Sequence, residues 1–553
     1  MQANHANIAI TLPYAKKKDG AHLAVAVQIE NEYQEITFSA LDRRCDEIAH
    51  GLVATGLVKG QRCVLMVTPS VDFFAITFAL FKIGVIPVLI DPGMGVKHLK
   101  TCIATSEATA FIGVPKAHVA RILFGWGKGC FKQLITVGPK LWGGTTLSKI
   151  VKKREQVFPV YAPTQNDIAA ILFTSGSTGT PKGVVYNHMM FNAQIASLKD
   201  VYGIAPGERD LATFPLFALF GPALGMTAVI PDMNASKPGA ADPNKLIAAI
   251  QKYQCTNMFG SPALLDVLSQ HYLQQKRKNI EIVLPTLKRV ISAGAPANLP
   301  SLKQFVPMLN PGVEVLTSYG ATESLPVSFI GTNELLVDTQ SATDQGAGVC
   351  VGRPLDSVDV QIISVVDEAI DLWDDNMALP NNKIGEICVQ GIVASSSYYG
   401  NETATKLAKI KTSDGCFYHR MGDVGYFDDR GRLWMCGRKT HRIECKTETL
   451  FTIPCERIFN THKMIKRTAI VPVRRDKQVT AVLCVELKAP KDVAKKNAIT
   501  EELLAIGRQH KITSSIDTIL FHKAFPVDIR HNAKIFREKL AVWATDKVNG
   551  GGG

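Results

Sequence analysis

The chain of 553 residues carries a net charge of +13, and 46% of its residues are apolar and 20% charged. This length exceeds what one hydrophobic core supports, and the composition excludes disordered and collagen-like classes. The basic residues are scattered in short clusters, which does not predict nucleic-acid binding. Twelve cysteines without a C-x-x-C pair predict reduced thiols in a cytoplasmic protein, with neither disulfides nor a zinc site.

Strand-like and helix-like segments alternate through the first two thirds of the chain. Ser39 and Asp42 predict a capping box at the start of an amphipathic helix, and the strands "RCVLMV" and "VIPVLI" flank a helix over 71–83. Further buried strands are predicted at "AAILF", "TAVIP", "RVISAG" and "VEVLTSYG". Continuous apolar strands that alternate with helices predict mostly parallel sheets covered on both faces.

The run 211–230 contains no charged residue and is long enough to span a bilayer. Because Pro215, Gly221, Pro222 and Gly225 interrupt it, we expect an interior wall of a soluble protein, with at most peripheral membrane contact.

The last third of the chain has a different pattern. The segment "YFDDRGRLWMCG" predicts a β-hairpin, and the tail 440–547 predicts a compact α+β unit with strands "RTAIVPV" and "TAVLCVEL" and a helix near 499–508. The acidic segment 367–375 predicts a surface loop, and the glycines 550–553 are interpreted as a flexible tail outside the fold.

One stretch, "ILFTSGSTGTPKGVV" (171–185), predicts a phosphate-binding loop after a buried strand. Backbone N–H groups, hydroxyls and one ammonium suit a polyphosphate, but Pro181 stands where a Walker loop needs glycine. A plain surface linker is the alternative interpretation. The candidate residues are Thr174, Ser175, Gly176, Ser177, Thr178, Gly179 and Lys182.

Three later segments add chemistry to this loop. "SYGATES" follows a predicted strand and places an aromatic ring and a carboxylate at a strand end, where open α/β sheets bind ligands. "MGDVGYF" and "GRK" supply a carboxylate and an arginine, and "FPVDIRHNAKIFREKL" supplies a lysine near the C-terminus. The candidates are Ser318, Tyr319, Gly320, Thr322, Glu323, Asp423, Arg438 and Lys534; each alone also fits a structural role.

In this order and spacing, the motifs resemble those of the adenylate-forming superfamily, which includes acyl-CoA synthetases, nonribosomal adenylation domains and firefly-type luciferases. The resemblance extends from about residue 20 to 545. It implies an α/β fold: a large N-terminal domain of mostly parallel sheets flanked by helices, with a β-rich subdomain, and a small mobile α+β C-terminal domain. The implied division is 1–436 and 437–549, with a hinge near Thr440.

The resemblance also implies ATP and Mg²⁺ as cofactors and assigns roles to the candidates. The loop would hold the outer phosphates, Asp423 and Arg438 the ribose, and Lys534 the carboxylate and α-phosphate during adenylation. Thr322 and Glu323 would face the α-phosphate and the metal ion. The resemblance also implies that Gly294, Ala295 and Pro296 lie beside the adenine, on which Tyr319 would stack, and that Thr178 lies near Mg²⁺. His188 matches a position beside the acyl pocket, and a core histidine is an equal alternative.

The same resemblance implies that the run 211–230 walls an acyl pocket, with Phe214, Phe217, Leu219, Phe220 and Gly221 as its candidate residues. Its lack of an acidic residue favours a long aliphatic acid over an amino acid. Relatives that make thioesters commonly have Asp or Lys at position 440, Lys at 444 and Gly at 447, whereas this chain has Thr440, Glu444 and Thr447. A β-branched residue in place of a close-approach glycine disfavours a thioester tunnel.

The strings "IDPGMG", "FPLFALFGPALG" and "FPVDIRHNAKIFREKLA" are similar to those of β-lactone synthetases from bacterial long-chain olefin biosynthesis. That resemblance implies a 2-alkyl-3-hydroxy fatty acid as substrate, adenylation of its carboxylate, and attack by its own 3-hydroxyl, with His188 as one candidate for the base. Partner enzymes of the same pathway are an expectation. A long-chain acyl-CoA synthetase and a non-catalytic acyl or nucleotide binder are the alternatives.

Overall fold

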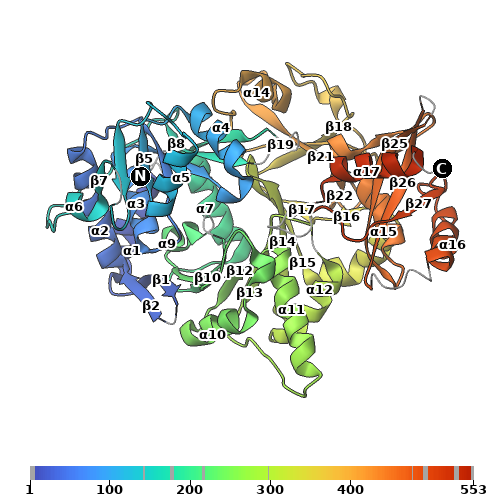
Figure 1. The fold of residues 1–553 in the computed structure, drawn as a ribbon, viewed down its shortest axis with the longest axis horizontal. Helices are drawn as coiled ribbons and strands as arrows, with labels where there is room; N and C mark the ends of the chain where they lie inside the picture. The colour runs from blue at the N-terminus through green and yellow to red at the C-terminus, as the bar shows by residue number, and fades with distance from the viewer. Residues whose placement is uncertain are drawn as a thin grey trace.

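The computed structural model describes residues 7–30, 32–140, 143–174, 180–214, 218–296, 298–475, 478–489, 496–527 and 535–549. Two mostly parallel sheets, a β-rich sheet and a C-terminal sheet follow one another from one end of the molecule to the other (Figure 1). This arrangement confirms the predicted fold class. Among the described residues, none of the helices combines the length and apolar character needed to cross a membrane.

The first parallel sheet, called sheet A, has the strand order β17-β15-β14-β13-β12-β10-β11-β1-β2. The strands from β14 to β1 run parallel, and antiparallel strands close both edges. Their bounds are β1 Leu23–Ile29, β2 Glu32–Thr37, β10 Arg209–Ala212, β11 Thr227–Ile230, β12 Asn257–Phe259, β13 Arg289–Ser292, β14 Val315–Ala321, β15 Ser324–Gly331 and β17 Arg353–Pro354.

The second parallel sheet, called sheet B, has the order β7-β6-β5-β3-β4-β8-β9, in which β9 alone is antiparallel to its neighbour among the described strands. Its strands are β3 Arg62–Met66, β4 Ile86–Ile90, β5 Ala110–Gly113, β6 Gln133–Thr136, β7 Thr145–Thr146, β8 Ile168–Thr174 and β9 Lys182–Asn187. The apolar runs predicted as buried strands therefore form the centres of both sheets.

Helices cover these sheets (Figure 1). Their bounds are α1 Thr11–Asp19, α2 Phe38–Ala54, α3 Val71–Ile83, α4 Val96–Ser106, α5 Pro115–Leu123, α6 Leu147–Ile150, α7 His188–Tyr202, α9 Phe220–Leu224, α10 Pro243–Tyr253, α11 Pro262–Lys276, α12 Leu299–Phe305 and α13 Gln340–Asp344. The helix predicted over 71–83 is confirmed as α3, which ends at Gly84 with a φ of 80°.

The capping box predicted at Ser39 and Asp42 is wrong. The N-cap of α2 is Thr37, whose side chain accepts a hydrogen bond from the Ala40 N–H, and Ser39 lies inside the helix. Asp42 is buried instead and pairs with Lys82 of α3 at 2.7 Å. The acidic residue therefore joins two helices rather than capping one.

Sheet B has a different apolar cluster on each face. One cluster fills the space between sheets A and B and includes Leu65, Leu89 and Leu172. The other cluster includes Val64, Val88 and Ile171 together with residues of α4 and α5. Because successive strand residues point to opposite faces, sheet B is buried on both sides, as its continuous apolar strands predicted.

The β-rich sheet has the order β16-β22-β21-β19-β18, and β20 also pairs with β21. Its elements are β16 Val349–Cys350, β18 Asp359–Ile363, β19 Gly385–Gln390, α14 Glu402–Ala408, β20 Lys409–Lys411, β21 Phe417–Phe427 and β22 Leu433–Arg438. Phe427 pairs with Leu433, which confirms the predicted hairpin.

The C-terminal part of the chain follows β22 and forms its own sheet, β25-β26-β27, at the end of the molecule shown in red (Figure 1). Its elements are β23 Ile443–Glu444, β24 Thr449–Leu450, α15 Thr452–Phe459, β25 Ile465–Arg475, β26 Gln478–Leu487, α16 Lys496–Arg508, β27 Thr518–Phe521 and α17 Arg537–Asn549. The short helix η8 (Lys439–His441) connects it to β22 at the predicted hinge. The rotation of this part about Thr440 stays a prediction.

Candidate active site

Thr174 and Lys182, which flank the predicted phosphate loop, lie at the carboxyl edge of sheet B. Thr174 ends β8 and pairs across the hairpin with Lys182, the first residue of β9. Residues 175–179, which include Ser175, Gly176, Ser177, Thr178 and Gly179, lie outside the described residues. The Lys182 ammonium lies 4.9 Å from the centre of the Tyr398 ring, so its charge faces a π-system at this edge.

Glu323 lies in the tight turn between β14 and β15. The Tyr398 hydroxyl donates a hydrogen bond to Glu323 Oε1 at 2.8 Å, and the Ser395 N–H donates to the Glu323 carbonyl at 2.7 Å. The Tyr186 hydroxyl donates to the Thr322 carbonyl at 2.6 Å. These bonds hold the turn and one oxygen of the Glu323 carboxylate in place, and Tyr398 contacts both Glu323 and Lys182.

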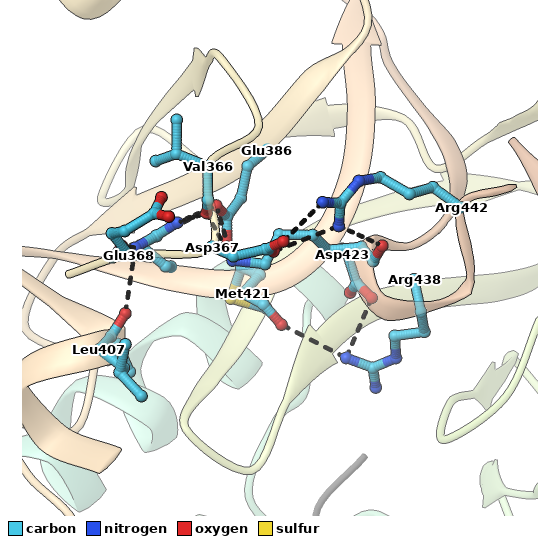
Figure 2. A network of polar contacts seen from close by, with 12 residues as sticks. Val366, Asp367, Glu368, Glu386, Leu407, Met421, Asp423, Arg438 and Arg442 are labelled. Carbon is cyan, nitrogen blue, oxygen red and sulfur yellow. Dashed lines mark hydrogen bonds and ion pairs between the residues drawn. The ribbon is translucent and has the colours of Figure 1, made fainter. Parts of the chain in front are cut away.

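Asp423 is buried beside β14. Its Oδ2 accepts a hydrogen bond from the Tyr319 hydroxyl at 2.9 Å, and Arg438 Nη1 lies 3.0 Å from its Oδ1 and also donates to the Met421 carbonyl at 3.3 Å (Figure 2). Burial raises the pKa of the Asp423 carboxyl, an effect that Arg438 opposes. Oδ1 is buried and has Arg438 as its ion-pair partner, but it accepts no hydrogen bond of good geometry from any described residue.

A cavity of about 1450 Å³ connects these regions, which exceeds the usual size of a small-molecule site. The sequence-predicted residues that line it are Thr174, Lys182, Phe214, Phe220, Gly294, Ser318, Gly320, Thr322, Glu323 and Arg438, and Thr440 lies at its hinge side. Segments far apart in the sequence therefore converge on one space, as the motif set predicted.

Other candidates lie beside the cavity or away from it. Tyr319 and Asp423 lie behind its wall, and Ala295 and Pro296 are not part of the lining. Leu219 and Gly221 were expected in the acyl pocket but pack in the core, where a Cβ at Gly221 would lie 3.1 Å from the Ala228 methyl. Phe217 and Lys534 lie outside the described residues. The stacking of Tyr319 on adenine stays a prediction.

The structure corrects the candidate His188. This residue is 4% exposed, does not line the large cavity, and its Nδ1 accepts a hydrogen bond from the Ile8 N–H at 3.3 Å. Its ring packs edge-on against Phe81. Burial lowers the pKa of His188 to about 4, which keeps the ring neutral. His188 is therefore a core residue that ties the N-terminal segment to α7.

Comparison with known proteins decides the family. The model of the family described as AMP-binding enzyme matches residues 14–399, well over half of the chain. The chain belongs to the AMP-binding, adenylate-forming enzyme family. The matched region contains sheets A and B, the predicted phosphate loop, Lys182 and Glu323, whereas Asp423 and Arg438 follow it.

Individual relatives extend the likeness over nearly the whole enzyme. It is 45% identical to an olefin beta-lactone synthetase of Xanthomonas campestris pv. campestris, over 93% of this chain and 91% of that protein. It is 46% identical to an olefin beta-lactone synthetase of Stenotrophomonas maltophilia, over 93% of this chain and 92% of that protein. The solved structure of ATP-bound MatB from Rhodopseudomonas palustris shares the fold, with a TM-score of 0.76 and 19% identity, and covers 99% of both chains.

Sequence reasoning missed a buried lysine–histidine pair beside the cavity of this AMP-binding enzyme. Lys409 Nζ lies 3.0 Å from His419 Nδ1 and also donates to the Ser395 carbonyl, and the His419 ring lines the cavity. Burial lowers the pKa of Lys409 to about 7 and holds the pKa of His419 well below its usual range. The two residues come from β20 and β21, and no motif in the sequence marks them.

A second missed feature is an ion network at the hinge side of the cavity. Arg420 contacts Glu386 through Nη2 at 2.6 Å and through Nε at 3.0 Å, and Lys439 Nζ lies 3.2 Å from Glu386 Oε1. Arg442, just after η8, donates to both carboxylate oxygens of Asp367, at 3.2 and 2.7 Å (Figure 2). The acidic segment, predicted to be a surface loop and assigned no role, thus contacts Arg442 near Thr440.

Proposed function

We propose that this enzyme is an olefin β-lactone synthetase, which activates a long-chain 3-hydroxy acid with ATP and closes it to a β-lactone. The observation that carries the proposal is its identity of 45% and 46% to two olefin beta-lactone synthetases over 93% of the chain. The cavity supports it, because polar groups at the edge of sheet B adjoin apolar walls that suit an aliphatic acid.

The residues at the cavity suit ATP, which supplies the adenylyl group that turns the carboxylate into an acyl-AMP. The Asp423 carboxylate, which Arg438 holds in place just behind the cavity wall, is the proposed acceptor for the ribose hydroxyls. The Thr174 hydroxyl and the Lys182 ammonium lie at the loop that is expected to hold phosphate. Two anions meet when a carboxylate attacks a phosphate, so the positive charge of Lys182 at this edge lowers the barrier.

Glu323 is the proposed contact for Mg²⁺. It lines the cavity, and Tyr398 donates to its Oε1 rather than to its Oε2. No group of three or more acidic, histidine or cysteine side chains in the described part of the chain is arranged to hold a metal. One carboxylate beside a phosphate site is nevertheless sufficient, because Mg²⁺ is commonly held by one or two carboxylates together with substrate phosphates.

Ring closure uses the substrate's own hydroxyl. The bond from the 3-oxygen to the acyl carbon forms, the bond from that carbon to the AMP oxygen breaks, and the hydroxyl proton leaves to a base or to solvent. A nucleophile within the same molecule reacts with a proximity advantage of up to about 7–11 kcal/mol, part of which offsets the strain of the four-membered ring. The site therefore needs no external thiol.

The test is an assay of the full chain with ATP, Mg²⁺ and a long-chain 3-hydroxy acid, with and without coenzyme A. We expect AMP, pyrophosphate and a lactone, identified by mass and by its carbonyl stretch, in the absence of coenzyme A. A thioester formed only with coenzyme A would establish the acyl-CoA synthetase alternative. No pyrophosphate with any acid would establish the non-catalytic alternative.

The role proposed for Lys534 has its own test. Replacing it as Lys534→Ala is expected to abolish pyrophosphate release from acid and ATP while ATP still binds. Unchanged pyrophosphate release would remove Lys534 from the reaction.

A further inference from the structure

The cavity extends onto both faces of sheet B. Leu65 and Met66 are neighbours at the end of β3 and both line it, and the same holds for Leu89 and Ile90 at the end of β4. Because adjacent strand residues point to opposite faces, the cavity passes around the carboxyl edge of the sheet. Each face therefore contributes its own apolar wall.

The first wall, called the sheet-interface arm, lies between sheets A and B. It is formed by Leu65 and Leu89 from sheet B, by Phe73 of α3, and by Ala212 and Phe220 from the region of sheet A. All five residues belong to or pack against the cluster that joins the two sheets. Ala212 and Phe220 of this arm belong to the run 211–230, which sequence reasoning assigned to the acyl chain.

The second wall, called the helix arm, lies on the opposite face of sheet B under α4 and α5. It is formed by Met66 and Ile90 of the sheet, Leu99 of α4, Ala120 of α5, and Trp126. These residues belong to or pack against the second cluster. Ala120 is half-buried and lines the cavity, and its side chain is small, so this wall has space for a ligand atom or a larger side chain. Nothing in the sequence motifs pointed to this arm.

Polar groups lie where the two arms meet. Thr68 and Asp91 follow β3 and β4, and Thr174 and Lys182 flank the phosphate loop, all at the carboxyl edge of sheet B. An acid with its carboxylate at this edge has apolar space on both sides of the sheet. A single unbranched chain fills one arm and leaves the other exposed to water.

We propose that the two arms bind the two alkyl chains of a 2-alkyl-3-hydroxy acid, one chain in each arm. This proposal rests on the proposed function, because it takes the adenylated acid as the occupant. The chains leave adjacent carbon atoms of the acid, so they diverge from one polar end, as the arms do from the edge of sheet B. The helix arm is thus assigned as a specificity site for the second chain.

The proposal predicts how adenylation depends on the length of each chain. Burial of one methylene strengthens binding by about fourfold. In pyrophosphate-release assays, kcat/KM is therefore expected to rise by about that factor for each methylene added to either chain, until its arm is full. The substrates are two series of synthetic acids, one varied at the 2-alkyl chain and the other at the 3-alkyl chain.

Variants assign the arms separately. Ala120→Trp fills the helix arm and is expected to abolish the length dependence of one chain only, whereas Ala212→Leu narrows the sheet-interface arm and shortens the tolerated length of the other. Ile122→Trp is the matched control, because Ile122 lies on α5, is 46% exposed and does not line the cavity. If Ala120→Trp does not fold, Ala117→Leu tests the same wall.

The readout separates this proposal from the proposed function, since it needs only the first half-reaction. If the enzyme forms a lactone but Ala120→Trp leaves the length dependence of both chains unchanged, the two-arm assignment is overturned and the proposed function stands. The assignment is also overturned if both cavity variants act on the same chain. A thioester product with intact length dependence of both chains would overturn the lactone synthetase and retain the two arms.

Discussion

Two groups of buried charges in this molecule have similar chemistry but different surroundings. In the core group, Lys82 is fully buried and lies 2.7 Å from Asp42 and 2.5 Å from Asp46, joining α3 to α2. In the cavity-side group, Glu386 is 1% exposed and contacts Arg420 and Lys439. Both groups consist of cations and carboxylates removed from water.

Their positions relative to the cavity distinguish them. None of the three core-group residues lines it, whereas Glu386, Arg420 and Lys439 all do. A buried ion pair alone is therefore no sign of a functional site, because buried pairs also occur where only packing is at stake. The same contrast separates His188, which is buried in the core, from His419, which is equally buried but reaches the cavity.

The largest expected effect is on the core group. Lys82→Met leaves Asp42 and Asp46 buried without their cation, and we expect the free energy of unfolding to fall by about 3–5 kcal/mol in urea denaturation. The folded fraction should still release pyrophosphate at the normal rate. Lys16→Met is the control, because Lys16 contacts the same Asp42 but is 40% exposed, and a loss within about 1 kcal/mol is expected.

A loss of activity without a loss of stability in Lys82→Met would break the comparison, since the core group would then act on the site. Equal destabilisation by the two lysine variants would show that burial does not set the strength of this network.

The second prediction concerns ATP binding at the cavity. Asp423→Asn keeps the size of the side chain but removes the charge that pairs with Arg438, and we expect ATP to bind about 10- to 100-fold more weakly in calorimetry. Stability should change little, because burial already disfavours the charged form. Asp359→Asn is the control, because Asp359 also accepts a hydrogen bond from a tyrosine, Tyr418. Neither Asp359 nor Tyr418 lines the cavity, whereas Arg438, the partner of Asp423, does. Equal ATP affinity in both variants would contradict the assignment of Asp423 to the ribose.

The third prediction is a pH dependence caused by Lys409. Its folded-state pKa of about 7 lies below the unfolded value of 10.5, so between these values the unfolded chain binds more protons than the folded one. The free energy of unfolding therefore rises with pH between about 7 and 10.5, by at most about 1.4 kcal/mol per pH unit. Below pH 7 the folded protein bears the full cost of burying the Lys409 charge.

Lys409→Met tests this sign. The variant loses the hydrogen bonds to Ser395 and His419, and this loss of stability does not depend on pH. As the pH falls from about 10 to 7, the wild type is destabilised by its buried charge and the variant is not, so the variant gains stability relative to the wild type. Urea denaturation at three pH values gives the difference. A difference that does not change with pH would show that Lys409 keeps its proton in the fold.

The sequence predicted those parts of the molecule that depend on local pattern. Strands such as "VIPVLI" and "AAILF" became β4 and β8, and Thr174 and Lys182 pair at the end of the hairpin where the phosphate loop was predicted. Features that depend on which distant segments pack together were missed. Lys82 was not singled out in the sequence, and Asp42 was predicted to belong to a helix cap, because nothing in either segment shows that they meet.

The helix arm was missed for the same reason. Leu99, Ala120 and Trp126 belong to or pack against an apolar cluster, and only the shape of the cavity shows that they also line it. His188 illustrates the opposite case, since the sequence left open a place beside the acyl pocket and a place in the core, and its burial away from the cavity supports the core.

The smallest effect is expected at the exposed ion pair between Asp367 and Arg442, which lies beside the cavity-side group. Asp367 is 63% exposed at its side chain, so Asp367→Asn should lower the free energy of unfolding by no more than about 1 kcal/mol, although it removes both bonds to Arg442. Glu444 also contacts Arg442 and retains one ion pair there. Added salt should diminish the difference further, because exposed charges are screened. A loss as large as that of Lys82→Met would mean that the contact at the hinge, and not burial, decides how strongly these networks hold the fold.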